Sequence, residues 1–300
     1  MTTPQGQHDS ARAIQARLIL LHTVWLTAFL FPITMPLVVL ALVSFALRMI
    51  GIELGYHRYF SHRSFQTSRL FQFILALLAT SSGQRGVIAW AEHHRKHHRH
   101  SDTEQDPHSP VRNSFWYAHV AWIWKDEHRN PTYKHVRDLT KFPELTFIDR
   151  HHYIATYGLM ALLFVLGEFS PVLGRTGMGL QAMIWGFMIP TLVTYQITMS
   201  INSLYHSDRL GNRAFETSDH SRNVWWMAIP SMGAAWHNNH HRYGSAARAG
   251  FHWWQIDISY YIIRALGFLG LVWDIREVPA RVLQELEENG STDPAPVHQA

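Results

Sequence analysis

Two long apolar stretches separate polar, histidine-rich segments along this chain of 300 residues. Residues 18–47 contain no Asp, Glu, Lys or Arg, and the apolar character then continues as far as residue 56, interrupted by Arg48 and Glu53. A membrane-spanning helix needs about 20 residues, so this stretch is too long for one span and just sufficient for two. Pro32 and Pro36 lie near its middle, where they favour a turn. The pattern predicts a hairpin of two helices over residues 17–33 and 35–58.

A second hairpin is predicted further along the chain. Residues 153–167 are free of charge, and residues 176–205 form another charge-free run of 30 residues. The segment between them contains Pro171 and Gly174, which indicate a short turn.

Two shorter apolar stretches do not have the length of a span. Residues 70–82 have the length expected of an interfacial or re-entrant helix. Residues 259–273 carry Arg264 near their middle and are typical of an amphipathic helix that lies on a membrane surface.

With two hairpins, residues 1–17, 59–152 and 206–300 lie on one side of the membrane. These segments hold most of the Lys and Arg, so the positive-inside rule makes that side cytoplasmic. We therefore expect an all-α integral membrane protein with four transmembrane helices in two hairpins and a cytoplasmic helical cap. The alternative is a soluble protein with buried helices, which two charge-free runs of 30 residues disfavour. The expected parts are a polar tail over 1–16, a membrane domain over 17–278 and an acidic tail over 279–300. In that tail, residues 284–288 are helix-like, and a disordered end follows them.

Composition narrows the chemistry. The chain has no Cys, which excludes disulfides, thiolate iron–sulfur clusters, Cys-type zinc sites and a Cys nucleophile. The net charge of +4 is compatible with nucleic-acid binding, but the apolar runs argue against it. The remaining outlier is histidine, with 22 copies, most of them clustered.

Four histidine clusters have the spacing of metal ligands. They are His57 with His62, then His94, His97 and His98, then Asn202 with His206, and finally His237, His240 and His241. On a helix, positions i, i+3 and i+4 share one face, so each HxxHH cluster brings three imidazoles together. Nine histidines are too many for one ion and sufficient for two. Imidazole suits Zn, Cu, Fe and Ni, so the ligand set alone does not choose the metal.

Two details of spacing need structural solutions. His57 and His62 are separated by five residues, about 140° apart on a straight α-helix, and they converge only if the helix ends or unwinds between them. In the second cluster, His93 and His100 offer an alternative register. We choose the HxxHH register because it repeats the spacing of the last cluster.

At these residues the chain resembles the membrane-bound fatty acid desaturases, in particular their acyl-CoA (delta-9) branch. The resemblance runs from about residue 18 to 278 and rests on several short segments. They are residues 55–63 (GYHRYFSHR), 94–98 (HRKHH) with 101–102 (SD) and 106–108 (DPH), 236–243 (WHNNHHRY) and 270–274 (GLVWD).

The resemblance implies a di-iron centre and an O₂-dependent reaction that removes two hydrogens from a saturated acyl chain, leaving a cis double bond, with delta-9 the position typical of that branch. It also implies that Asn202 reaches a metal through water. The implied ligands are His57, His62, His94, His97, His98, His206, His237, His240 and His241. An apolar substrate tunnel is expected, although each candidate aromatic is also typical of core packing or of a membrane interface. These candidates are Trp90, Trp116, Trp122, Tyr205 and Trp236.

Substrate and electron donor are less defined. Glu92 and His93 stand where animal acyl-CoA members commonly have Arg-Asp, which weakens a CoA head group and leaves acyl-lipid and acyl-carrier-protein substrates open. With no fused cytochrome domain and no Cys, electrons are expected from a separate ferredoxin with its reductase or from a separate cytochrome. We expect a bacterial cytoplasmic membrane, with both termini and the active site on the cytoplasmic side.

Two other functions are compatible with the histidines. A hydroxylase acting on acyl chains would use the same di-iron centre, and product analysis separates alkene from alcohol. A metal transporter or other non-catalytic metal-binding membrane protein would place its ligands along a path within the spans. The clusters lie at span ends on one side, which favours the enzyme.

Overall fold

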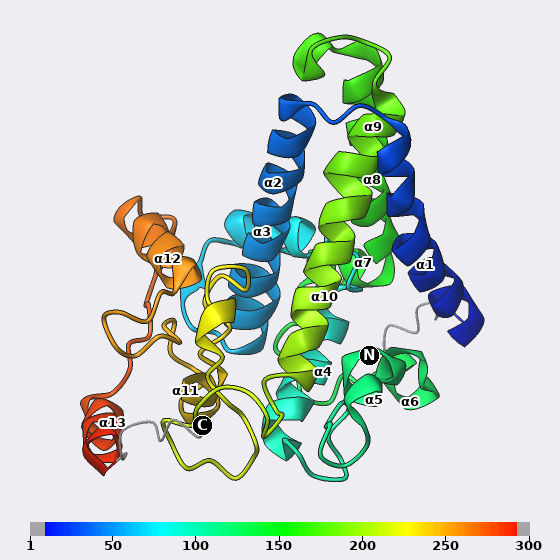
Figure 1. Cartoon of the computed structure of the whole chain (residues 1–300). Helices are drawn as coiled ribbons and strands as arrows, with labels where there is room; N and C mark the ends of the chain where they lie inside the picture. The colour runs from blue at the N-terminus through cyan, green and yellow to red at the C-terminus, as the bar shows by residue number, and fades with distance from the viewer. Residues whose placement is uncertain (1–9, 293–300) are drawn as a thin grey trace, which may run out of the picture.

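Four apolar helical segments form the upper part of the molecule (Figure 1). The computed structural model describes residues 10–292. Within that range, four segments are long and apolar enough to cross a membrane. They are Ala11–Leu30, Met35–Ser61, His152–Phe169 and Gly179–Ser203. Their outward side chains are largely exposed, with Phe29 70% and Met35 72% exposed, as expected of surfaces that face lipid. The four predicted spans are therefore confirmed.

The first hairpin begins earlier than the pattern predicts. Helix α1 (Ala11–Val24) starts where the Ser10 side chain accepts a hydrogen bond from the Ala13 amide, and it continues as a 3₁₀ turn, η1 (Trp25–Leu30). Side-chain capping satisfies an amide that the first turn leaves free, so the helix extends into the segment assigned to a polar tail. Residues 1–9 of that tail lie outside the described residues.

The second span changes its winding before the first histidine cluster. Helix α2 (Met35–Ile50) has Pro36 in its first turn and continues without a break as a π-helix, η2 (Gly51–Ser61). Gly51 and Gly55 allow close approach to α3 (Arg69–Thr80), because a Cβ on Gly51 would lie 2.8 Å from the Leu78 carbonyl carbon. The first histidine cluster, His57 with His62, thus sits on a wide helix packed tightly against its neighbour. We call this cluster the first box, the cluster at 94–98 the second box and the cluster at 237–241 the last box.

The second hairpin agrees closely with its predicted bounds. Helix α8 (His152–Phe169) is followed by a 3₁₀ turn, η4 (Pro171–Leu173), and Gly174 has a φ of +102°. The returning span consists of α9 (Gly179–Met183), a short π-helix, η5 (Ile184–Met188), and α10 (Ile189–Ser203). In Figure 1, α10 runs between α1 and α2.

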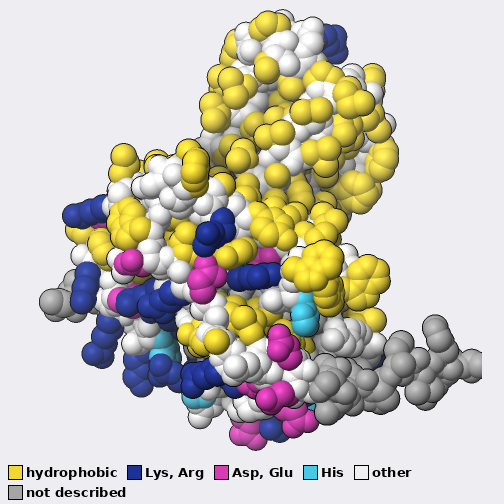
Figure 2. All heavy atoms as spheres, turned by 90° about the vertical axis from the view of Figure 1, so that its left-hand side faces the viewer, with side chains coloured by type: hydrophobic (Ala, Val, Ile, Leu, Met, Phe, Trp, Pro, Cys, Tyr) yellow, Lys and Arg dark blue, Asp and Glu magenta, His cyan; other side chains and the backbone are white. Residues whose placement is uncertain are grey.

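A helical cap lies below the spans and carries most of the charged side chains (Figure 2). Strands β1 and β2 form a short antiparallel pair that joins the end of the first box to the C-terminal part of the cap. The remaining cap elements are α4 (Val87–His100), α5 (Phe115–His119), η3 (Ala121–Trp124), α6 (Asp126–Arg129), α7 (Pro143–Arg150), η6 (Trp225–Met227), α11 (His237–Arg242), α12 (Ile258–Phe268), α13 (Ala280–Thr292), β1 (Gln66–Thr67) and β2 (Val272–Trp273).

The two short apolar stretches are helices α3 and α12, and neither reaches the length of a span. Each has exposed apolar side chains beside buried ones: Leu70 is 71% and Phe268 93% exposed, whereas Leu75 and Ile263 are buried. This pattern is typical of helices at a membrane interface.

The acidic stretch expected to be helix-like at 284–288 belongs to a longer helix, α13 (Ala280–Thr292), which docks on the cap. Val282 and Leu286 of α13 are buried against Phe215 and Phe251, and Arg242 beside the last histidine box forms an ion pair with Glu285. The apolar contacts order residues 280–292, while residues 293–300 lie outside the described residues.

Candidate metal centre

The π-helix η2 brings His57 and His62 of the first box onto one face. In this winding the His62 amide donates to the His57 carbonyl, five residues earlier, over 3.2 Å. Residues i and i+5 therefore share one face, and the His57 and His62 ring centroids lie 5.0 Å apart. The sequence signal was the five-residue spacing itself, which a widened helix satisfies without ending between the two histidines.

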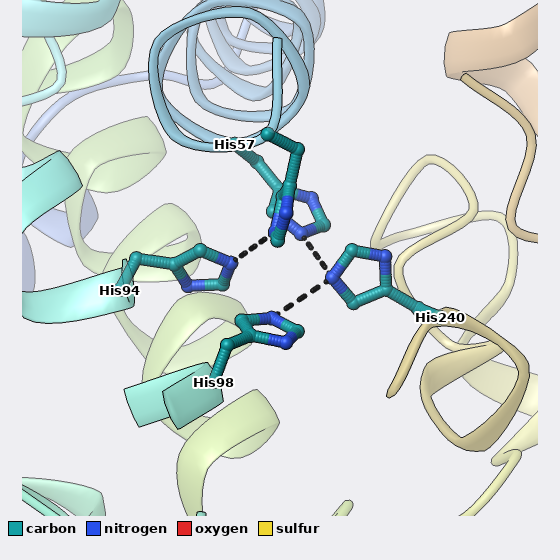
Figure 3. Close-up of side chains that lie close together, drawn as sticks. His57, His94, His98 and His240 are labelled. Carbon is teal, nitrogen blue, oxygen red and sulfur yellow. Dashed lines mark hydrogen bonds between the residues drawn. The ribbon is translucent and has the colours of Figure 1, made fainter. Parts of the chain in front are cut away.

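Five histidines from three helices converge on one point (Figure 3). The Nε2 atoms of His57 and His240 lie 3.0 Å apart, as do those of His240 and His98. The Nε2 atoms of His62 and His94 are 2.7 Å apart. All five donor nitrogens lie within 4.8 Å of one another. We call His57, His62, His94, His98 and His240 the five-histidine group.

A second group lies directly beside the first. It consists of His97, His206, His237 and His241, whose donor atoms are again within 4.8 Å of one another. The rings of His98 and His241 stack across the two groups at 4.4 Å. The structure thus brings together all nine histidines singled out by spacing, while His93 and His100 lie outside both groups.

Four carboxylates orient these rings. Glu53 accepts from Nδ1 of His57 at 3.0 Å, and Asp106 from Nδ1 of His97 at 3.0 Å. Asp102 accepts from His206 at 2.8 Å, and Asp219 from His241 at 2.5 Å. A carboxylate on Nδ1 fixes the tautomer and leaves Nε2 as the free donor. Of the other nearby acids, Glu104 is exposed and Glu92 binds His135 and Thr132 instead.

Burial keeps most of the histidines uncharged. Desolvation, reinforced by neighbouring histidines, lowers the pKa of His94, His98, His237 and His240 well below its ordinary value. Burial also lowers the pKa of His241, to about 4. Neutral imidazole is the form that binds metal.

The carboxylates remain ionised inside the cap. Burial alone would raise the pKa of Asp219, but its hydrogen bond from His241 holds that pKa well below its usual range. For Asp102, burial likewise acts upward, yet the His206 hydrogen bond lowers its pKa to about 2. At His97 burial acts downward, but the Asp106 carboxylate outweighs it and raises the pKa. The site therefore combines histidines that burial keeps uncharged with ionised carboxylates around them.

The donor set fits two metal ions. With metal–nitrogen bonds of about 2.1 Å, two ligands of one ion lie at most about 4.2 Å apart, close to the spread found in each group. His241 Nε2 is buried without a hydrogen-bond partner among the described residues, as expected of a metal ligand. A third group, His97 with Asp106 and His108, shares His97 with the second.

Asparagines hold the last box in place. The Asn238 side chain accepts from the amides of Ala214 and Phe215 at 2.8 Å, and Asn223 donates to Asn239 at 2.8 Å. These bonds tie α11 to the loop that carries Asp219. Sequence spacing marked the histidines of this box and gave no signal for its asparagine network.

The second box has a cap from another helix. Gly86 precedes α4 and has no side chain to cap it, and Asp149 of α7 instead accepts from the amides of Ile88 and Ala89 at 3.0 and 2.9 Å. Helix α4 is thereby fixed at the end opposite its histidines. This role of Asp149 was not foreseen, because the contact joins residues about 60 positions apart.

An apolar cavity of about 320 Å³ lies beside the centre. Its wall includes His94 and Asn202, and α1, α8 and α10 supply much of the rest. Of the five candidate tunnel aromatics, Trp90 and Trp122 line it. The other three do not: Trp116 is 69% exposed, Tyr205 is buried against His237, and Trp236 donates to the Ile256 carbonyl. Those three pack in the core or face outward, the alternative noted for each candidate.

The position of His93 tests the choice of register. This side chain is buried, lines the cavity and lies near Trp122 and His128. Replacing His93 with Ala is therefore expected to leave the bound metal at its wild-type stoichiometry and to retain substantial activity. Elemental analysis of the purified variant measures this. Complete loss of metal would support the alternative register, in which His93 is a ligand.

Comparison with known proteins gives a consistent result. The model of the fatty acid desaturase family matches residues 33–270. The chain is 35% identical over 265 residues to a hex-5-enoyl-[acyl-carrier protein] acetylenase of Moorena producens, covering 85% of this chain and 81% of that protein. It is 36% identical over 251 residues to delta-9 acyl-lipid desaturase 1 of Arabidopsis thaliana, covering 82% and 77%. It is 34% identical over 228 residues to an sn-1 stearoyl-lipid 9-desaturase of Anabaena variabilis, covering 76% and 79%.

Proposed function

This chain belongs to the fatty acid desaturase family, and we propose that it introduces a cis double bond at the delta-9 position of a saturated acyl chain in an O₂-dependent reaction. The observation that carries the proposal is the convergence of nine histidine nitrogens beside an apolar cavity. A helix-lined apolar cavity suits an alkyl chain, and a metal centre in its wall suits oxidation of that chain.

We propose that each histidine group holds one iron ion and that Asn202 reaches the centre through water. Iron supplies the activation of O₂ that cleavage of an aliphatic C–H bond requires, which no amino-acid side chain provides. The protein presents imidazoles in fixed positions, since Glu53, Asp102, Asp106 and Asp219 hold four of the rings. Burial of these groups keeps bulk water from the centre.

The cavity is lined by both polar and apolar residues. Arg85, Arg129 and His128 lie among the polar lining residues, and Phe187 and Met160 among the apolar ones. We propose that the acyl chain lies with its carbonyl group beside the polar residues and its methyl end among the apolar ones. In this orientation it would pass His94 and Asn202. This orientation is what places a carbon in mid-chain next to the metal centre.

We propose an acyl chain carried on a membrane lipid as the first substrate. Helix α1 contributes Leu18 and Leu21 to the cavity wall, and it has no buried residue of its own. A wall made by one loosely packed span gives chains in the bilayer a short route to the cavity. Two of the relatives are named as acyl-lipid or stearoyl-lipid desaturases, and one acts on an acyl-carrier-protein substrate by its name. Acyl-CoA is the comparison substrate. Position 92 holds a glutamate, which binds His135, and therefore supplies no positive charge for a phosphate of CoA.

Electrons are proposed to come from a separate acidic carrier, of the ferredoxin or cytochrome type. Of the basic residues near the centre, Arg95 pairs with Asp138 and Arg242 with Glu285, so these two have internal partners. Lys96 and Arg99 on α4 remain candidates for the docking surface. By the positive-inside rule we place this face and both termini in the cytoplasm of a bacterial cell.

The proposed reaction is tested by fatty-acid analysis of a desaturase-deficient host. The host expresses the chain, or its His98→Ala variant, together with a ferredoxin and its reductase. We expect a new monounsaturated acid with a delta-9 double bond in the wild type and none in the variant. The lipid and CoA pools are analysed separately to identify the first substrate.

Two results would overturn the proposal. Hydroxy acids in place of alkenes would make the chain a hydroxylase. Absence of any oxidised product from metal-loaded, folded protein with a reduced carrier would indicate a non-catalytic metal-binding protein.

A further inference from the structure

Arg48 is a cation inside the second span. It lies on α2, between the apolar upper part of that helix and the first histidine box, and it is 1% exposed. No carboxylate within the described residues pairs with it. Placing such a charge within a bilayer is costly, so an arginine there calls for a specific role.

The guanidinium of Arg48 binds backbone carbonyls of the fourth span. Nη1 donates to the Phe187 carbonyl over 3.0 Å, and Nη2 to the Gly186 carbonyl over 3.2 Å. Nη1 also contacts the Thr191 hydroxyl, and the charge lies 4.5 Å from the centre of the Phe187 ring. All these partners belong to η5 and the first turn of α10.

These carbonyls need donors because the helix changes its winding there. In η5 the Ile189 amide donates to Ile184, five residues earlier, in place of the usual α-helical partner. Pro190 follows and has no amide hydrogen, so it cannot satisfy the carbonyl of Gly186 four residues before it. The Ser44 hydroxyl supplies a second donor to Gly186, over 2.5 Å. Arg48 and Ser44 of α2 thus complete the hydrogen bonding of the π-helical turn.

The same turn forms part of the cavity wall. Phe187, Met188 and Thr191 all line the cavity, and two of them contact Arg48 directly. Asn202, near the metal centre, lies fifteen positions after Phe187 on the same span. At 1.5 Å per residue this separation is about 22 Å. The turn is therefore the cavity's remote wall on this span.

We propose that Arg48 is a positioning residue for acyl-chain selection: it holds the η5 turn, and with it the Phe187, Met188 and Thr191 wall, in the shape that sets which chain lengths fit. This inference rests on the proposed function in so far as the cavity takes an acyl chain. A turn held by the guanidinium keeps the wall rigid, and a rigid wall discriminates by length.

Binding of saturated acyl chains tests the proposal without turnover. The purified protein in lipid nanodiscs is titrated with a lauroyl-to-eicosanoyl series of fatty acids that displace a fluorescent fatty acid. Arg48→Met keeps an unbranched, apolar side chain and removes the guanidinium. In this variant we expect discrimination against longer chains to fall by about tenfold, which corresponds to roughly one methylene group in an apolar pocket. Arg48→Lys retains a donor for the carbonyls and is expected to recover part of the selectivity.

Three comparisons make the result decisive. Arg264→Met on α12, an exposed arginine outside the cavity, serves as the matched control and is expected to bind like the wild type. Metal content in Arg48→Met is expected to equal that of the wild type, since Arg48 contacts no histidine. Thr191→Val removes the hydroxyl that contacts Arg48 and is expected to shift the chain-length profile in the same direction. This second variant keeps the proposal testable if Arg48→Met does not fold.

An unchanged length profile in folded Arg48→Met or in Thr191→Val would overturn the inference. Absence of acyl binding by the wild type would overturn it together with the proposed substrate. Acyl binding with wild-type selectivity but no oxidised product would contradict the proposed reaction alone, so the two failures are distinguishable.

Discussion

Replacement of His240 by alanine is expected to abolish product formation and to remove the metal of the five-histidine group. Its Nε2 lies 3.0 Å from the Nε2 atoms of both His57 and His98, so it is the central donor of that group. The His240 side chain is buried, at 4% exposed. Loss of a direct ligand should cost more than the roughly 10- to 100-fold that follows loss of an outer-shell partner. Elemental analysis and product formation are measured on the same preparation.

The matched control for this prediction is His252→Ala. His252 is a histidine of the same C-terminal half that stacks on Trp254 and lies outside both groups. It is expected to keep its metal and its activity. Wild-type activity in His240→Ala would show that this residue is not a ligand.

Replacement of Asp219 by asparagine is expected to weaken metal binding at the second group by about 10- to 100-fold. This group consists of His97, His206, His237 and His241. Asp219 accepts from His241 Nδ1 at 2.5 Å and is itself held by Ser221 and Thr217. Asparagine has the same shape but carries no charge, so the imidazole loses the anionic acceptor that strengthens its donor nitrogen. A metal titration of the apoprotein, followed by fractional occupancy, measures the effect.

Asp208→Asn provides the control for charge alone. Asp208 is exposed, pairs with His220 and Arg222 and belongs to neither histidine group. Its replacement should leave both metal affinities unchanged. If Asp219→Asn bound both ions as tightly as the wild type, the orienting role of the carboxylate would be refuted.

Periodicity and motif spacing were sufficient for the spans and for the convergence of the histidines. Charge-free runs have only one common explanation at that length, and HxxHH has one geometry on a helix. The separation of five between His57 and His62 was recognised as incompatible with a straight α-helix. The spacing alone does not predict a π-helix; the structure shows one over Gly51–Ser61, with Gly51 and Gly55 close to α3.

Other features depend on contacts between distant residues, which spacing along the chain does not reveal. Asp102 reaches His206 across 104 positions, and Arg48 reaches Phe187 across 139. In the sequence Arg48 was only an interruption of an apolar run. Aromatic residue type likewise does not predict which residues line the cavity. Trp90 and Trp122 line it, whereas Trp116, Tyr205 and Trp236 do not.

The central claim is that nine histidines hold two iron ions in one centre. Its most direct test is the metal content of the purified, membrane-embedded wild-type protein, measured by elemental analysis together with Mössbauer spectroscopy. The account predicts two irons per chain, both with nitrogen-rich coordination, and loss of metal in His240→Ala. A single ion per chain, or zinc in place of iron in a fully active preparation, would contradict it.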